Sequence, residues 1–346
     1  SVIAMVTCVC LGLILAIGAG LTILRPINFS PDQAVTPSPT ETLAEQPATL
    51  TPEAELPSDI AEIALEIEAQ VSQIRGLTVH TPVPRVLMSP DALEDIVVNE
   101  FFAEYTDEDA RQDVLVLSLL GLLPADFDLK NFYNDLYSEQ ISGFYDGETG
   151  EIYILKGTTF GGSEKLTYAH EFTHVLQDQT FEFDAGLNYN EEACEEDSER
   201  CAAIQSLIEG DASLTEIFWF QTYATRADYQ DIVQTFEDFA SPVLDAAPPY
   251  MALDLYFPYE KGFSFVEFLY NEGGYDAVNV AYENPPLSTE HILHPERYPW
   301  DAPVRITLRN LEETLGPGWV LFDQNVMGEW YTYLILSQAY EEAFRI

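Results

Sequence analysis

The sequence predicts an α+β fold that is mainly helical, with a small β-sheet that includes one hairpin. Long stretches of the chain repeat apolar residues at intervals of three and four, as amphipathic helices do. In residues 141–155, two aromatic and β-branched runs flank the turn signal "DGETG", which predicts a β-hairpin. Hydrophobic residues make up 47% of the chain, enough for a packed core.

The elements are predicted in order from Ser58 or Asp59, the expected N-cap of a first helix that continues to about residue 77. Residues 85–88, "RVLM", predict a short strand. Residues 285–300 lie between prolines and show no long periodicity. Further helices are expected at 89–105, 106–123, 128–140, from a Ser163 cap through the histidine-containing segment, and at 198–224, 226–240, 262–272, 275–283 and 329–345.

The first 24 residues are apolar and carry no charge before Arg25, long enough for a helix that crosses a bilayer. Because this run is longer than the core of a usual signal peptide and no clear cleavage site follows it, residues 1–25 predict an uncleaved transmembrane anchor. Residues 26–58 are rich in Pro, Thr, Ser and Glu, which predicts a disordered stalk. The folded domain is then residues 59–346, whose last helix ends without a cap.

Two features place this domain outside the cytoplasm, although Arg25 favours the opposite orientation under the positive-inside rule. The first is the stalk composition. The second is the pair Cys194 and Cys201, which bracket a short polar loop and predict a disulfide in an oxidising compartment. Two free thiols or a metal pair are the alternatives. The prediction is a single-pass protein of the cell membrane with its folded domain on the outer side.

The charge balance restricts the partners. Asp and Glu number 59 against 14 Lys and Arg, for a net charge of −45. Such a surface repels phosphate-rich ligands, which excludes nucleic acid and anionic lipid headgroups as partners of the folded domain. The same charge would attract a cationic substrate.

Residues 166–179, "LTYAHEFTHVLQDQ", hold two of the five histidines. On a helix, His170 and His174 lie about 40° apart around the axis, so both imidazoles face one point with a spacing that suits a divalent ion. Glu171 is rotated about 100° from His170, where it reaches a water bound to such an ion. A surface helix that happens to carry two histidines is the alternative.

A catalytic zinc ion usually has three protein ligands, and no third histidine follows at short range. Glu209 lies 35 positions after His174 in an apolar helical run, "AAIQSLIEGDASLTEIFWFQ". A buried carboxylate needs compensation that a metal ion provides, so Glu209 is the candidate third ligand, with an exposed glutamate as the alternative. Asp211 lies about 200° around the helix from Glu209, so we expect it to bond to a histidine ligand or to the backbone instead.

Together, "HEFTHVLQDQTFEF" and "SLIEGDASL" resemble the gluzincin metallopeptidases, which pair HExxH on one helix with a glutamate on the next. More narrowly, they resemble an uncharacterised prokaryotic group with HELTHALQDQ-like and EGDA-like segments. "ISGFYDGETGEIYI" and "STEHILHPERY" also fit that group, so the resemblance spans about residues 85–300. It implies a mainly helical, zincin-like metallopeptidase domain with a small sheet before the HExxH helix.

By this resemblance, one Zn²⁺ ion is held by His170, His174 and Glu209, and Glu171 activates the attacking water. One arm of the hairpin at 141–155 would be a free sheet edge along which an extended peptide lies.

The oxyanion formed during attack needs a further donor, and gluzincins use a His or Tyr downstream of the glutamate ligand. His294 and Tyr298 in "ILHPERY" are the candidates, with His291 as a third. A structural loop stiffened by proline is the alternative for this segment.

The leading functional prediction is a membrane-tethered, extracytoplasmic zinc metallopeptidase that cleaves a peptide or protein substrate. One alternative is a non-catalytic surface domain whose zinc is structural and whose groove binds a partner. Another is a zinc amidase that acts on a non-protein amide. The intact Glu171 favours hydrolysis, because a binding domain has no need of a general base beside the ligands.

Overall fold

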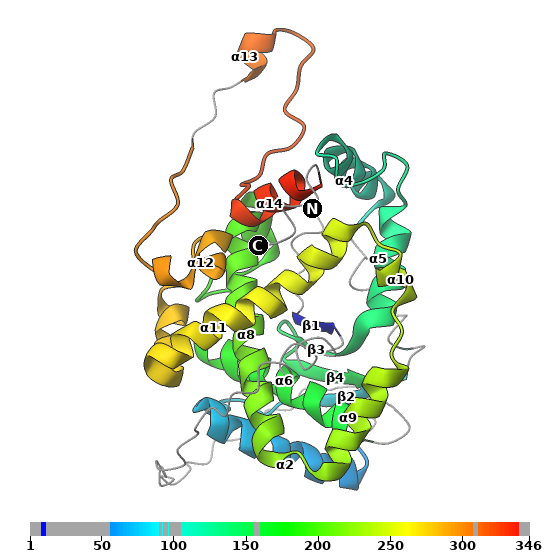
Figure 1. Ribbon diagram of the computed structural model, residues 1–346, viewed down its shortest axis with the longest axis vertical. Helices are drawn as coiled ribbons and strands as arrows, with labels where there is room; N and C mark the ends of the chain where they lie inside the picture. Colours follow the sequence, from blue (N-terminus) through cyan, green and yellow to red (C-terminus); the bar gives the residue numbers. More distant parts are fainter. Residues whose placement is uncertain are drawn as a thin grey trace, which may run out of the picture.

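The computed structural model describes residues 8–11, 56–89, 92, 96, 105–155, 160–306 and 311–338. It is mainly helical with one small sheet, which confirms the α+β prediction (Figure 1). The strands are β1 (Cys8–Leu11), β2 (Arg85–Met88), β3 (Ile141–Asp146) and β4 (Glu151–Leu155). The helices are α2 (Ser58–Arg75), α4 (Asp107–Leu119), α5 (Leu129–Gln140), α6 (Gly162–Phe181), α7 (Glu191–Glu196), α8 (Ser198–Tyr223), α9 (Arg226–Asp238), α10 (Pro242–Asp245), α11 (Pro249–Glu283), α12 (Thr289–Leu293), the 3₁₀ turn η3 (Pro295–Arg297), α13 (Leu311–Leu315) and α14 (Glu329–Ser337).

The sheet has the strand order β1-β3-β4-β2. Strands β3 and β4 form the predicted antiparallel hairpin, with Phe144 opposite Tyr153, and their rings stack at 4.6 Å between centroids. Strand β2 runs parallel to β4, and β1 runs antiparallel to β3. Each arm of the hairpin therefore has a neighbouring strand on both sides. The expectation that one arm is a free edge for an extended peptide is not met.

The predicted membrane anchor is corrected by the structure. Of residues 1–25 only Cys8–Leu11 are described, and they form strand β1 instead of a helix. Within the described part of the chain, no helix is both long and apolar enough to cross a bilayer, which contradicts the single-pass membrane localisation. An apolar run fits a buried strand as well as a helix, and its composition does not distinguish them. The predicted stalk, residues 26–58, lies outside the described residues except for its last three.

The first helix confirms its predicted apolar face. Ala64, Ile67, Val71 and Ile74 of α2 are buried, at the three- and four-residue spacing from which the helix was predicted. The helix ends at Gly76, which has a left-handed conformation with φ of 75° and suits glycine at a helix end. Another predicted helix, residues 89–105, lies almost wholly outside the described residues.

The HExxH helix α6 begins two residues earlier than a Ser163 cap requires. Gly161 is the N-cap, and its N–H donates to the Glu164 carboxylate at 2.9 Å. The Ser163 hydroxyl instead bonds to Thr235 of α9 at 2.8 Å. Gly162 lets α6 approach α9 closely, because a Cβ there would lie 2.2 Å from the carbonyl oxygen of Asp228.

Helices α8 and α11 cross in the middle of the molecule, as Figure 1 shows. Glycines on both helices allow a close approach: a Cβ on Gly210 would lie 2.2 Å from the carbonyl oxygen of Gly262. Helix α11 contains both predicted segments, 262–272 and 275–283, separated by a kink at Gly273 and Gly274. It begins well before residue 262, in a Tyr-rich stretch with an internal proline where the sequence predicted no helix.

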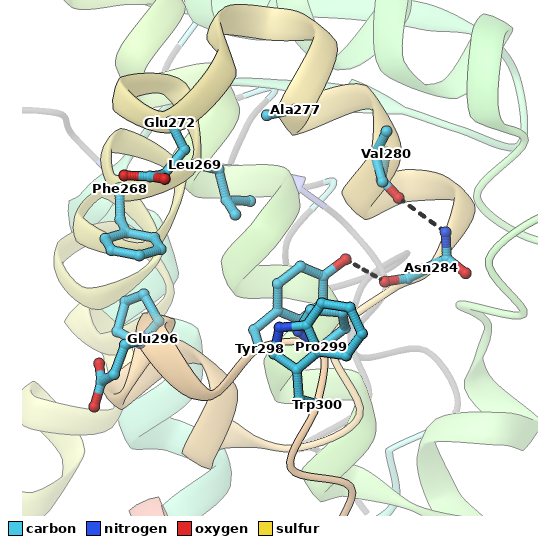
Figure 2. A pocket seen from close by; sticks show the side chains of 11 residues that line it. Phe268, Leu269, Glu272, Ala277, Val280, Asn284, Glu296, Tyr298, Pro299 and Trp300 are labelled. Carbon is cyan, nitrogen blue, oxygen red and sulfur yellow. Dashed lines mark hydrogen bonds between the residues drawn. The ribbon is translucent and has the colours of Figure 1, made fainter.

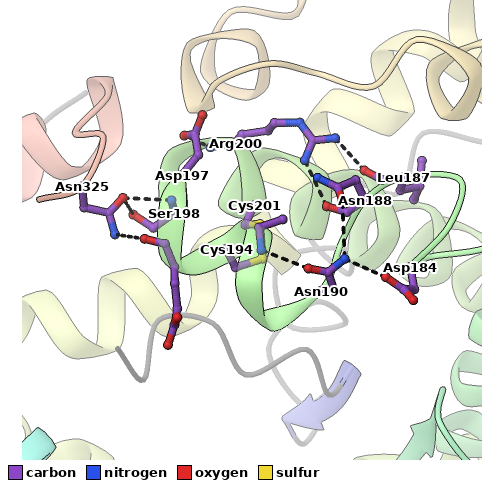
Figure 3. The surroundings of a disulfide bond; sticks show 12 residues. Asp184, Leu187, Asn188, Asn190, Cys194, Asp197, Ser198, Arg200, Cys201 and Asn325 are labelled. Atoms are coloured by element: carbon purple, nitrogen blue, oxygen red, sulfur yellow. Dashed lines mark hydrogen bonds between the residues drawn. A yellow bond between two sulfur atoms is a disulfide. The ribbon is translucent and has the colours of Figure 1, made fainter. Parts of the chain in front are cut away.

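The predicted disulfide between Cys194 and Cys201 is confirmed (Figure 3). The segment between the cysteines is largely helical where a loop was predicted, because it contains the end of α7 and the start of α8. Asp197 caps α8 by accepting from the N–H of Arg200 at 3.1 Å. Ser198 donates to Asn325 at 3.0 Å, which ties the beginning of α8 to the segment before α14.

Between α12 and α14 the chain leaves the body of the protein and returns, with α13 near its far end (Figure 1). Helix α14 rejoins the body through buried polar contacts. Glu199 of α8 accepts hydrogen bonds from the N–H and hydroxyl of Thr289, at 2.6 and 2.7 Å. The Thr289 hydroxyl oxygen in turn accepts from the N–H of Trp330 at 3.0 Å.

The burial of Asp254 on α11, where it contacts Trp330, makes stability depend on pH. The indole N–H donates to the carboxylate at 2.8 Å, and burial raises the pKa of Asp254 to about 6. Between about pH 4 and pH 6 the folded protein holds a proton that the unfolded chain has released, so stability falls as the pH rises through this window. We expect Asp254→Asn, which keeps an acceptor for Trp330, to raise the free energy of unfolding at neutral pH by about 2 kcal/mol.

Urea unfolding of wild type and Asp254→Asn at about pH 4 and pH 7 checks this expectation. The two proteins should differ little at the lower pH and clearly at the higher one. Equal stability at both would show that the buried carboxylate costs nothing.

Candidate metal centre

Helices α6 and α8 bring the three predicted ligands together in the core. His170 and His174 lie one turn apart on α6, and Glu209 lies at the middle of α8, which packs against it. The three side chains are fully buried, and their nearest ligand atoms all lie within 4.8 Å of one another. In the described part of the chain this group could hold a metal ion.

The nitrogen atoms that face Glu209 are the two Nε2 atoms. Oε2 of Glu209 lies 3.2 Å from Nε2 of His170 and 3.5 Å from Nε2 of His174. The other carboxylate oxygen, Oε1, has no hydrogen-bond partner among the described residues. Buried polar atoms are rarely left without partners, so this oxygen is a point where a ligand would be favourable.

Each histidine contacts a different partner through its second nitrogen. Nδ1 of His170 lies 3.0 Å from a carboxylate oxygen of Glu216, which is two helical turns after Glu209 on α8. Nδ1 of His174 lies 2.8 Å from the amide oxygen of Gln177 on its own helix. Partners of this kind orient the rings of metal-bound histidines. Neither Glu216 nor Gln177 was predicted from the sequence as part of the site.

The buried charges shift one another's pKa values. Burial opposes protonation of His170, but its bonds to Glu209 and Glu216 outweigh this effect and raise its pKa to about 9. Burial also opposes protonation of His174, and Glu209 raises that pKa to about 9 as well. Burial would raise the pKa of Glu209, yet the two histidines lower it to about 2. Burial raises the pKa of Glu216 to about 7, even though His170 lowers it. The site therefore holds positively charged histidines and a negatively charged glutamate together in a part of the core that is buried from solvent.

Glu171 lies beside the first ligand and is fully buried. Its charge is near enough to raise the pKa of both His174 and Glu216. A carboxylate in such a position suits a general base that works next to a metal ion. Among the described residues, the group that could hold a metal ion consists of His170, His174 and Glu209 and does not include Glu171.

Asp211 does not contact either histidine directly, contrary to one of its two expected roles. Its Oδ2 accepts from the amide N–H of Gln177 at 2.9 Å, and Gln177 contacts His174. The same carboxylate is ion-paired with Arg75 of α2 at 2.8 Å, and both side chains are fully buried. The hydroxyl of Tyr282 on α11 also donates to Asp211, at 2.9 Å.

The two predicted oxyanion donors have other partners in the structure. His294 contacts Glu329 of α14 at 2.9 Å, and both side chains are partly exposed. The hydroxyl of Tyr298 donates to the carbonyl oxygen of Asn284 at 2.6 Å. The third candidate, His291, is buried with Nε2 2.7 Å from the carbonyl oxygen of Asp301. All three side chains therefore have hydrogen-bond partners outside the group of metal-ligand candidates.

Tyr298 lines a separate pocket between α11 and η3 (Figure 2), and the volume of this pocket is about 570 Å³. Its other walls include Phe268, Leu269 and Trp300, and none of the three metal-ligand candidates lines it. The aromatic residue that the structure places beside the ligands is instead Tyr259 of α11. Its ring centroid lies 6.4 Å from that of His170. In sequence, Tyr259 is one of many aromatic residues in a run that fits either core or pocket lining.

The chain was compared with protein-family models, with curated proteins and with solved structures, and none of them matches it.

Proposed function

We propose that this protein is a zinc-dependent hydrolase that cleaves peptide bonds, with Zn²⁺ held by His170, His174 and Glu209. The resemblance to gluzincin peptidases, read from the two motifs, is part of this proposal. The observation that carries it is the spacing of the ligand atoms in the buried core.

That spacing fits a zinc ion. Two ligands about 2.1 Å from a tetrahedral ion lie about 3.4 Å apart, and the Nε2 atoms of His170 and His174 lie 3.2 and 3.5 Å from Oε2 of Glu209. Two imidazole nitrogens and a carboxylate oxygen are also a ligand set that zinc accepts.

The number of ligands favours catalysis over a structural role. Structural zinc sites have four protein ligands, whereas catalytic sites have three and keep one position for water or substrate. The described group contains three residues. When bound, zinc acts as a Lewis acid and brings the pKa of water to about 7.

The chain's own residues then supply proton transfer. We assign to Glu171 the removal of a proton from the attacking water and its delivery to the leaving amine. Glu216 and Gln177 hold the two imidazole rings in place through Nδ1. Burial of all these groups excludes bulk water, which strengthens each electrostatic contact.

We assign the oxyanion donor to Tyr259, because its ring lies beside His170 while His294 and Tyr298 bond elsewhere. Tyr259→Phe is expected to lower kcat about 100-fold with zinc content unchanged, since one such donor contributes on that scale. Steady-state kinetics and metal analysis check this. Tyr256→Phe, the same change one turn earlier on α11, is the control. A Tyr259→Phe enzyme with wild-type kcat would remove Tyr259 from the mechanism.

The proposed function is tested by metal analysis of the purified protein together with a broad peptide library read by mass spectrometry. We expect one zinc ion per chain, cleavage of peptides, loss of cleavage after chelation and recovery when Zn²⁺ is added back. A protein that binds no zinc would refute the proposal. Tightly bound zinc without cleavage would favour the surface-binding domain, and cleavage of non-peptide amides alone would favour the amidase.

A further inference from the structure

A buried chain of side chains begins at His174 and ends on α2. Gln177 contacts Nδ1 of His174 through its amide oxygen at 2.8 Å. Its amide nitrogen donates to Asp211 at 2.9 Å and to the carbonyl oxygen of Ile208 at 3.0 Å. Asp211 is ion-paired with Arg75 at 2.8 Å. The side chains of His174, Gln177, Asp211 and Arg75 are all fully buried, so no solvent competes for these contacts.

The surroundings of Gln177 fix the orientation of its amide. An amide group has an oxygen that only accepts and a nitrogen that only donates. A backbone carbonyl and a carboxylate can only accept, so the atom that faces Ile208 and Asp211 must be the nitrogen. The reversed amide would place its oxygen against two acceptors in a buried site, which is unfavourable because each buried polar group would lose its hydrogen bond.

The orientation of Gln177 determines which nitrogen of His174 keeps its hydrogen. Because the amide oxygen faces Nδ1, that nitrogen must be the donor, as N–H. The lone pair of the neutral ring is then on Nε2, which points to Glu209. The tautomer of His174 is thus determined through Gln177 by two acceptors, the Ile208 carbonyl oxygen and the Asp211 carboxylate, that do not contact the imidazole themselves.

Arg75 holds the Asp211 carboxylate in place. A guanidinium group only donates, and its Nε lies 2.8 and 3.0 Å from the two oxygens of Asp211. The ion pair with α2 therefore fixes the position of the acceptor that faces the Gln177 amide nitrogen.

We propose that Gln177, Asp211 and Arg75 are positioning residues that reserve Nε2 of His174 for a metal ion by holding a hydrogen on Nδ1. This inference rests on the proposed zinc site and deepens it. It adds Arg75 of α2, a helix that lies outside both the HExxH and the EGDA-like segments. His170 has a different support, the carboxylate of Glu216. The two histidine ligands are thus oriented by independent partners.

The test replaces Gln177 with Leu, which has a similar size and cannot accept a hydrogen bond. In competition with a chelator, the Zn²⁺ affinity of Gln177→Leu should fall about 10- to 100-fold, the usual effect of losing a partner that orients a ligand. In ¹⁵N-histidine-labelled protein, the slowly exchanging Nδ1–H signal of His174 should disappear. Gln179→Leu is the matched control on the same helix, because the amide of Gln179 bonds to residues 80 and 81 instead.

A second variant separates positioning from packing. Gln177→Met keeps a side chain of the same length as Gln and, like Leu, has no amide oxygen to accept from Nδ1–H. It should lose the signal and the zinc affinity as Gln177→Leu does, whereas a pure packing role would let it keep both. Unchanged affinity and an unchanged signal in Gln177→Leu would overturn the inference, as would a folded Gln177→Met protein that keeps both. If the wild type binds no zinc, the proposed function fails, and the Nδ1–H signal by itself still decides the positioning.

Discussion

Glu171→Gln is expected to lower the rate of peptide cleavage by about 10²- to 10⁴-fold, the usual contribution of a general base. Gln has nearly the same shape as Glu and cannot take a proton, so the change removes only the proposed chemistry. Zinc content should stay at the wild-type level, because Glu171 is outside the ligand group. Stability should not fall, because the substitution removes a buried negative charge that lies near Glu216.

The measurement is kcat on one cleaved peptide, together with zinc analysis and thermal unfolding of both proteins. Glu164→Gln is the matched control on α6, since Gln keeps an oxygen that can accept from the N–H of Gly161. A Glu171→Gln protein that cleaves at the wild-type rate would contradict the assigned role. One that loses its zinc would instead make Glu171 a ligand.

The largest effect on stability is expected at Gly210, next to the ligand Glu209. A Cβ there would lie 2.2 Å from the carbonyl oxygen and 2.3 Å from the carbonyl carbon of Gly262, and backbone atoms in a helix cannot move aside like a side chain. Helices α8 and α11 would have to separate. We expect Gly210→Ala to lower the free energy of unfolding by about 3 kcal/mol, the upper part of the range for overpacking. Zinc affinity should also fall, because Glu209 moves with its helix.

Chemical unfolding and a zinc competition assay check this expectation. Gly262→Ala should have a similar effect from the other side, since its Cβ would lie 2.1 Å from the carbonyl oxygen of Ser206. Gly147→Ala in the hairpin turn is the control, because the nearest atom to its added Cβ would be 3.6 Å away. If Gly210→Ala is as stable as this control, the two helices are not held at close approach.

The metal ligands could be predicted from sequence because their geometry is local. His170 and His174 are one turn apart on one helix, so their convergence follows from helical periodicity. Glu209 was identified from the cost of burying a carboxylate in an apolar run. Glu216 carried the same signal seven residues later, on the same face of α8, and the structure shows it to be fully buried beside His170. Applying the burial argument to both glutamates would have found it.

Residues whose place in the site depends on how distant helices pack could not be predicted from local sequence patterns. Arg75 is the last residue of α2, where a basic side chain usually interacts with the helix dipole at the surface. Its burial against Asp211 depends on how α2 packs against α6 and α8. Tyr259 was missed because α11 begins earlier than its periodicity indicated, which changes which aromatic residues face the ligands.

The contacts of α14 determine whether the protein stays together when its backbone is cleaved between Trp300 and Trp319. The segment between Trp300 and Trp319 exposes large apolar side chains, including Val304 and Ile306, which are 87% and 82% exposed. Helix α14 is nonetheless held by Thr289, Glu199 and Asp254, which all precede that segment. A single nick there would leave two fragments whose mutual recognition surfaces are intact. The C-terminal fragment, supplied separately, would then act as a complementing peptide for the rest of the protein.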